Sequence, residues 1–126
     1  MEGEGIGPLR VSRRMVSVPG SGASARGDGA GRQDREVESW SLALGGAWGL
    51  VGLPGEVLVE IGLQIKQESP FGTTAVVELG LDDPGYVPTD AAIEEGGYEP
   101  SGSPFGRGTE AALVGGGRAA LRDVAP

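Results

Sequence analysis

The sequence predicts an α/β fold in which an incomplete mixed sheet, flanked by helices, belongs to a larger domain. Two apolar runs suited to strands lie on either side of a stretch with helical periodicity. Strand, helix and strand at this spacing are typical of a βαβ unit. The chain of 126 residues has only two each of Trp, Tyr and Phe. Because large aromatic side chains dominate core burial, this low number of aromatic residues indicates that the chain has an incomplete core.

Two strands joined by a loop are predicted in residues 1–46. In the first strand, near residues 9–18, valines alternate with serine before a Pro-Gly pair. The stretch 20–31 is rich in glycine and is expected to be a loop. The second strand, near residues 34–44, alternates in polarity. Its predicted apolar face consists of Trp40, Leu42 and Leu44.

Residues 47–126 form the second predicted segment and contain the βαβ unit. A short apolar run at 47–53, bounded by glycine turns, predicts a buried strand. A helix is predicted over 56–66, and the Thr- and Val-rich run 73–79 predicts the next strand. The predicted apolar face of the helix consists of Val57, Leu58, Ile61 and Ile65.

The C-terminal part is predicted to be weaker. A short helix near 91–95 is followed by a Gly/Pro/Ser-rich loop at 96–108 and by a final helix over 110–123. Three consecutive glycines at 115–117 interrupt that last helix. Each costs about 1 kcal/mol relative to alanine in a helix interior. The final helix is therefore expected to fray or break there.

Charge disfavours nucleic acid as a partner. The net charge is −8, and residues 41–126 carry four basic residues against twelve acids. Residues 9–40 carry six arginines against four acids, which is typical of a solvated strand pair. The acidic part lacks the basic footprint of a nucleic-acid-binding surface.

Residue types that the chain lacks restrict its chemistry. Without cysteine there is no disulfide or thiolate, and without histidine the commonest general base and metal ligand are missing. No apolar run is long enough for a transmembrane helix, so no membrane span is expected. No signal peptide is seen either, which predicts a cytoplasmic protein if Met1 is the true N-terminus.

The junction Pro54-Gly55-Glu56 is the sharpest local feature. Gly55 permits a tight turn, and Glu56 is then expected in the first turn of the following helix, near its positive end. A carboxylate there has two possible roles. It either only stabilises the positive end of the helix, or it points from the sheet edge at which α/β folds bind ligands. The two tyrosines, Tyr86 and Tyr98, are predicted in loops, where a tyrosine is most often a partly buried packing residue.

Three short motifs follow one another between residues 47 and 100. They are Gly52-Leu53-Pro54-Gly55-Glu56, Gly85-Tyr86-Val87-Pro88-Thr89 and Gly97-Tyr98-Glu99. In order and approximate spacing they resemble neutral/alkaline non-lysosomal ceramidases, and more closely their shorter bacterial homologues. The resemblance implies that residues 47–126 are the C-terminal part of the catalytic domain of such a hydrolase.

The family resemblance implies a zinc-dependent site. Family members hydrolyse the amide of ceramide, and two histidines, a glutamate and a tyrosine hold their zinc. By resemblance, Glu56 and Tyr86 correspond to the metal-binding glutamate and tyrosine, and Tyr98 to a tyrosine of the substrate pocket. No catalytic residue is assigned on this chain. A lipid amide such as ceramide is the implied substrate.

The missing histidines leave three hypotheses. The first is a C-terminal fragment of a ceramidase-like zinc amidohydrolase, inactive alone because half of the metal ligands lie elsewhere. The second is a non-catalytic scaffold or interaction remnant, which requires a stable fold without metal. The third is a truncated gene product that shows no cooperative unfolding.

Overall fold

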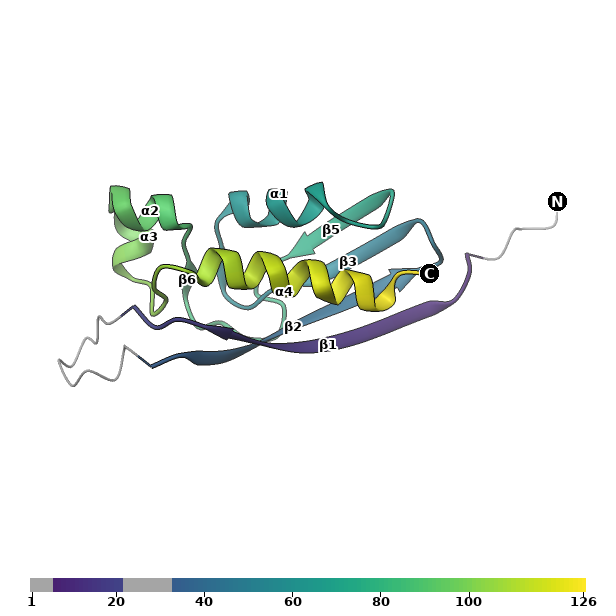
Figure 1. Cartoon of the computed structure of the whole chain (residues 1–126), viewed down its shortest axis with the longest axis horizontal. Coiled ribbons are helices and arrows are strands. Elements are labelled where there is room, and N and C mark those ends of the chain that lie inside the picture. The colour runs from purple at the N-terminus through teal and green to yellow at the C-terminus, as the bar shows by residue number, and fades with distance from the viewer. Residues whose placement is uncertain (1–5, 22–32) are drawn as a thin grey trace.

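The predicted α/β fold class is confirmed in a computed structural model, which describes residues 6–21 and 33–126 (Figure 1). A four-stranded mixed sheet has antiparallel pairs on one side and a parallel pair on the other. Its strands, in spatial order, are β1 (Leu9–Val18), β2 (Arg35–Leu44), β3 (Trp48–Gly52) and β5 (Thr73–Val77). Two further strands, β4 (Glu56–Val57) and β6 (Tyr86–Val87), pair in parallel as a separate small sheet.

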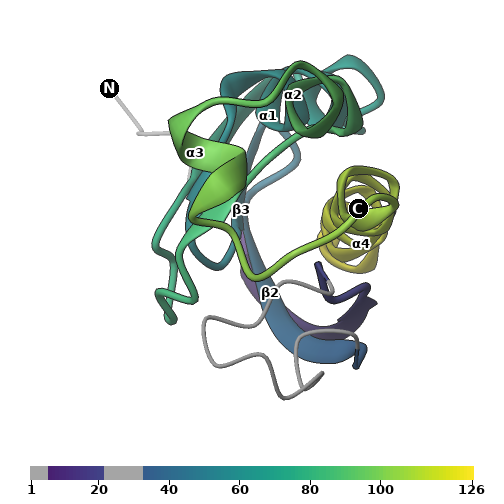
Figure 2. The same ribbon diagram turned by 90° about the vertical axis from the view of Figure 1, so that its left-hand side faces the viewer.

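The described helices are α1 (Val59–Gln67), α2 (Asp90–Glu95), α3 (Tyr98–Ser101) and α4 (Thr109–Val124). Helix α1 connects the parallel strands β3 and β5, as the predicted βαβ unit requires. Helix α4 packs across β1, β2 and β3 and beside α1 (Figure 2). Among the described residues, no helix has the length and apolar character needed to span a membrane.

The core lies between the four-stranded sheet and the helices α1 and α4. On the sheet side, Val16, Val37 and Val51 are buried. On the helix side, the fully buried side chains include Ile61, Ile65 and Leu121. Strand β2 pairs with β3 across the predicted boundary between residues 46 and 47, so both predicted segments contribute to this core.

The predicted orientation of β2 was wrong. Its core-facing residues are Val37, Ser39, Ser41 and Ala43, whereas Trp40, Leu42 and Leu44 lie on the other side of the sheet and are partly exposed. The two buried serines are tolerated in the core because each hydroxyl donates a hydrogen bond. Ser39 Oγ donates to Gly52 O at 3.0 Å, and Ser41 Oγ donates to Ala120 O at 2.6 Å.

The predicted helix start at residue 56 was also wrong. Helix α1 begins at Val59, and Glu56 lies in β4. The cause is the neighbouring strand, because Glu56 N donates to Gly85 O at 3.0 Å and Leu58 N donates to Val87 O at 3.1 Å. The chain enters this extended pairing through Gly55, whose φ is +74°.

The final helix does not break at its glycines. Helix α4 runs without interruption from Thr109 to Val124. A Cβ atom on Gly116 would lie 2.5 Å from Val16 Cγ2, and one on Gly117 would lie 2.7 Å from Ile65 Cδ1. The glycines therefore allow α4 to approach β1 and α1 closely, and tertiary packing offsets their poor helix propensity.

The predicted loops are only partly described. Most of the glycine-rich stretch 20–31 lies outside the described residues, although Gly20 forms a bridge with Phe105. The predicted loop 96–108 contains the short helix α3 and is fixed to the fold by Phe105, which is 2% exposed. Ser103 Oγ donates to Tyr86 O at 2.6 Å, which ties this loop to β6.

Candidate functional site

The small sheet of β4 and β6 brings two predicted site residues together. Glu56 and Tyr86 are register partners in this parallel pair. The turn before β4 is held by a hydrogen bond from Gly55 N to Asp82 O at 2.9 Å. Both side chains line one cleft of about 670 Å³. Backbone pairing thus fixes the relative position of two polar groups that are far apart in sequence.

The cleft is strongly acidic. Its lining includes the glutamates Glu56, Glu60, Glu78, Glu95, Glu99 and Glu110, and no basic residue is among its described lining residues. Two of the carboxylates also support the fold, because Glu78 Oε2 accepts from Val57 N at 3.0 Å and Glu110 Oε2 accepts from Asp90 N at 2.8 Å. This negative surface favours a cationic group over an anionic one.

Sequence reasoning missed this convergence of glutamates. Glu60 and Glu95 lie on two different helices, and both line the cleft. They come from α1 and α2, while Glu99 and Glu110 come from α3 and α4. No regular spacing connects residues contributed by so many separate elements, so no sequence motif could have signalled the cleft.

Tyr86 is the group whose ionisation the cleft alters most clearly. The neighbouring Glu56 carboxylate, followed by partial burial of the ring, raises the pKa of the Tyr86 hydroxyl above its ordinary value. Tyr86 therefore remains a neutral hydroxyl, able to donate a hydrogen bond, over the physiological pH range.

Tyr98 contacts Tyr86, which lines the cleft, but Tyr98 is not itself a lining residue. The ring centroids are 5.7 Å apart, with an interplanar angle of 71°, which is the edge-to-face arrangement that aromatic pairs favour. Tyr98 is the first residue of α3 and is 76% exposed. Neither tyrosine is in the loop that the sequence predicted, since Tyr86 belongs to β6.

The juxtaposition of Glu56 and Tyr86 predicts a measurable titration shift. In a Tyr98→Phe background Tyr86 is the one remaining tyrosine, so ultraviolet absorbance reports its ionisation alone. Glu56→Gln removes the negative charge that disfavours the phenolate. We therefore expect the Tyr86 midpoint to move to lower pH, toward its ordinary value.

The matched control for this titration is Glu60→Gln, which neutralises another cleft glutamate that does not contribute to the Tyr86 shift. Circular dichroism across the same pH range verifies that the chain stays folded. A midpoint that Glu56→Gln leaves unchanged would show that the carboxylate and the hydroxyl are not neighbours in solution.

The described residues do not by themselves fit a zinc ion. They contain no group of three or more His, Cys, Asp or Glu side chains arranged to hold a metal. Catalytic zinc takes three protein ligands with histidine prominent among them, and this sequence has no histidine or cysteine. Glu56 and Tyr86 offer only two ligand residues, so their assignment as metal ligands remains a prediction.

Comparison with known proteins gives a structural relationship. No family model and no curated protein matches the sequence. A solved structure described as neutral ceramidase from Pseudomonas aeruginosa has a similar fold, with a TM-score of 0.67 and 17% sequence identity over 95% of this chain. The match spans 29% of that ceramidase chain. The present chain therefore has the fold of one part of a much longer ceramidase.

Proposed function

We propose that this chain is the C-terminal part of a ceramidase-like lipid amidohydrolase, to whose active site it supplies Glu56, Tyr86 and Tyr98. The observation that carries the proposal is the pairing of Glu56 with Tyr86 in one cleft, within a fold that matches part of a neutral ceramidase over 95% of this chain. The missing histidines would come from polypeptide outside these 126 residues. With two such histidines, Glu56 and Tyr86 would complete a four-ligand zinc shell.

The residues of this chain would each have a distinct task. Glu56 supplies negative charge in the cleft, and Tyr86 beside it supplies a neutral hydroxyl. Tyr98, exposed beside Tyr86, offers an aromatic surface on which the apolar part of a lipid amide can pack. The Tyr86–Tyr98 contact orients both rings toward the same substrate.

The proposal predicts that the isolated chain has no zinc-dependent ceramidase activity. Two ligand residues do not form a catalytic zinc site, so we expect no release of fatty acid from a fluorescent ceramide, with or without added zinc. Isothermal titration with zinc should likewise give no saturable stoichiometric binding. Turnover that a chelator abolishes would contradict this expectation and would indicate a metal site within the chain itself.

The decisive experiment restores the missing part. Genomic DNA upstream of the Met1 codon is read for a segment that encodes paired histidines, and the joined polypeptide is expressed. We expect zinc-dependent ceramide hydrolysis that falls by more than about 100-fold in Glu56→Gln, with Glu94→Gln as an exposed acidic control. An active joined chain in which Glu56→Gln is harmless would refute the role of Glu56, and the absence of any such segment would refute the fragment proposal.

A second candidate function is protein interaction without catalysis. One specific observation favours it, namely that the sheet leaves large apolar side chains exposed on the side away from α1 and α4. Such a surface is expected on a protein that binds another polypeptide. This candidate predicts a folded chain that remains inactive whatever upstream segment is joined to it.

A further inference from the structure

The strand that carries Glu56 is short and is held from two sides. Strand β4 consists of Glu56 and Val57 alone. On one side of it, Glu56 N and Leu58 N donate to the carbonyl oxygens of Gly85 and Val87, at 3.0 and 3.1 Å. Successive backbone N–H groups of a strand point in opposite directions, so Val57 N points away from β6. The partner of Val57 N must therefore lie on the other side of β4.

The carboxylate of Glu78 occupies that other side. Glu78 Oε2 accepts from Val57 N at 3.0 Å, where a wider sheet would place a carbonyl oxygen of the next strand. A hydrogen bond from a backbone N–H to an ionised carboxylate is stronger than one to a neutral acceptor. Glu78 directly follows β5. The bond therefore connects β4 to the end of the main sheet.

The next residue, Leu79, holds the same turn through its backbone. Leu79 N donates to Gly55 O at 2.9 Å. The bonds from Glu78 and Leu79 thus reach the residues directly after and directly before Glu56. Leu79 has φ +52° and is the one non-glycine with positive φ within residues 6–21 and 33–126. Such backbone strain persists where surrounding contacts impose it, and it clusters at functional sites.

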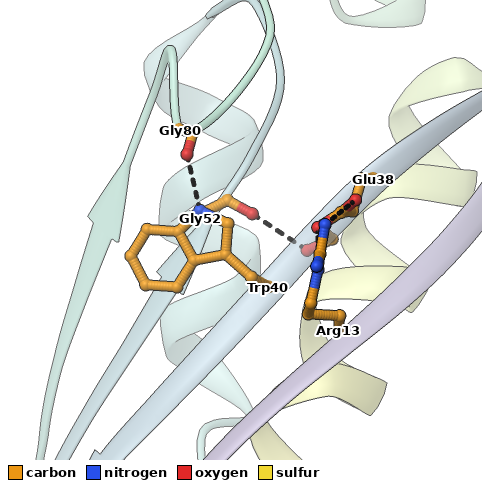
Figure 3. Close-up of polar contacts among 6 residues, drawn as sticks. Arg13, Glu38, Trp40, Gly52 and Gly80 are labelled. Carbon is orange, nitrogen blue, oxygen red and sulfur yellow. Dashed lines mark hydrogen bonds and ion pairs between the residues drawn. The ribbon is translucent and has the colours of Figure 1, made fainter.

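Contacts of Gly80 impose the strained conformation of Leu79. Gly80 N donates to Leu53 O at 2.9 Å, and Trp40 Nε1 donates to Gly80 O at 2.7 Å (Figure 3). A Cβ atom on Gly80 would lie 3.0 Å from Trp40 Nε1 and 3.1 Å from Gly52 Cα. The segment after β5 therefore lies close against β2 and β3, and these contacts do not involve β6.

We propose that Glu78 is a positioning residue of the candidate site, which fixes Glu56 opposite Tyr86 by holding β4 against the main sheet. Strand β6 supplies the hydrogen bonds on one side of β4, and the Glu78 carboxylate supplies the bond on the other. The inference rests on the proposed function, because the position of Glu56 matters for chemistry only if Glu56 is a site residue. Glu78 acts through the backbone of β4, although its side chain lines the same cleft.

The test is amide hydrogen exchange in the full chain of 126 residues, followed residue by residue by nuclear magnetic resonance. Glu78→Ala removes the acceptor, so exchange at Val57 should accelerate whatever the role of Glu78. A positioning role also requires exchange at Glu56 and Leu58, whose acceptors lie on the β6 side, to accelerate by about 10-fold or more. Nuclear Overhauser contacts between the Glu56 and Tyr86 side chains should weaken in the same variant.

Two matched variants separate the acceptor oxygen from its charge. Glu78→Gln keeps an acceptor oxygen, so exchange at Glu56 and Leu58 should stay within about 3-fold of the rates in the unaltered chain. Glu95→Ala removes a different carboxylate from the cleft lining and should change neither rate. Circular dichroism should show that all three variants are folded.

The outcomes separate this inference from the proposed function. The exchange experiment needs neither zinc nor an upstream segment, so it can succeed even if the joined polypeptide does not hydrolyse ceramide. Unchanged exchange at Glu56 and Leu58 in folded Glu78→Ala would overturn the inference, and so would equal acceleration in Glu78→Gln and Glu78→Ala. Acceleration of the same size at the amide of Ile65, in the core, would also overturn it, because Glu78 would then support the whole fold.

Discussion

Gly55→Ala is expected to destabilise the chain by about 2–5 kcal/mol and to separate Glu56 from Tyr86. Gly55 has φ +74°, and a Cβ atom there would collide with the carbonyl oxygen of Gly85. That carbonyl accepts the hydrogen bond from Glu56 N that begins the pairing of β4 with β6. The substitution therefore combines left-handed backbone strain with a clash against backbone that cannot move aside.

Two measurements distinguish the local effect from general unfolding. Urea denaturation gives the loss in free energy of unfolding, and the Tyr86 midpoint should fall as the Glu56 carboxylate moves away. Gly96→Ala is the matched control, because Gly96 also has positive φ, +76°, but has open space around its Cβ position. If the two substitutions cost the same and neither moves the Tyr86 midpoint, the Gly85 contact does not organise the site.

Strand and helix positions followed from local patterns in this sequence. Residues 47–53 and 73–79 were predicted as strands around a helix because short apolar runs with glycine boundaries favour that reading. The structure places β3 and β5 within those ranges, and α1 lies between them at Val59–Gln67. Ile61 and Ile65 are fully buried, as their spacing on one helix face predicted.

The errors arose where long-range contacts outweighed local preference. In β2 the predicted apolar face with Trp40 lies outward, because buried Ser41 bonds to α4 through Ala120 O. Glu56 lies outside the helix because the carbonyl of Gly85, directly before β6, accepts its backbone N–H and β4 pairs with β6. Both contacts join residues that are far apart in the sequence, so the pattern of neighbouring residues could not predict them.

The candidate site was predictable only in part. The motifs around Glu56, Tyr86 and Tyr98 pointed to these residues through a family resemblance, and their roles in metal and substrate binding remain predictions. Their spatial relationship depends on the pairing of β4 with β6, which each motif alone does not specify. The remaining cleft glutamates come from separate helices and had no motif of their own.

Gly116→Leu is expected to destabilise the chain by about 3 kcal/mol or more, although leucine is a far better helix former than glycine. The Cβ atom alone would lie 2.5 Å from Val16 Cγ2 and 3.5 Å from Val16 Cβ. Val16 is short, β-branched and held in β1, so it cannot turn away without moving the strand. Helix α4 would have to lift from the sheet, which exposes core residues such as Leu121.

Gly115→Leu supplies the matched comparison, because a Cβ at Gly115 meets nothing within 4 Å. The same gain in helix propensity should there stabilise the chain by up to about 1 kcal/mol. Gly117→Ala should fall between them, since its obstacle is the terminal methyl of Ile65, which can rotate. Thermal and urea unfolding should therefore rank the three variants, from most to least stable, as Gly115→Leu, Gly117→Ala and Gly116→Leu. Equal responses at Gly115 and Gly116 would contradict the close contact between α4 and β1, because propensity alone would then explain both.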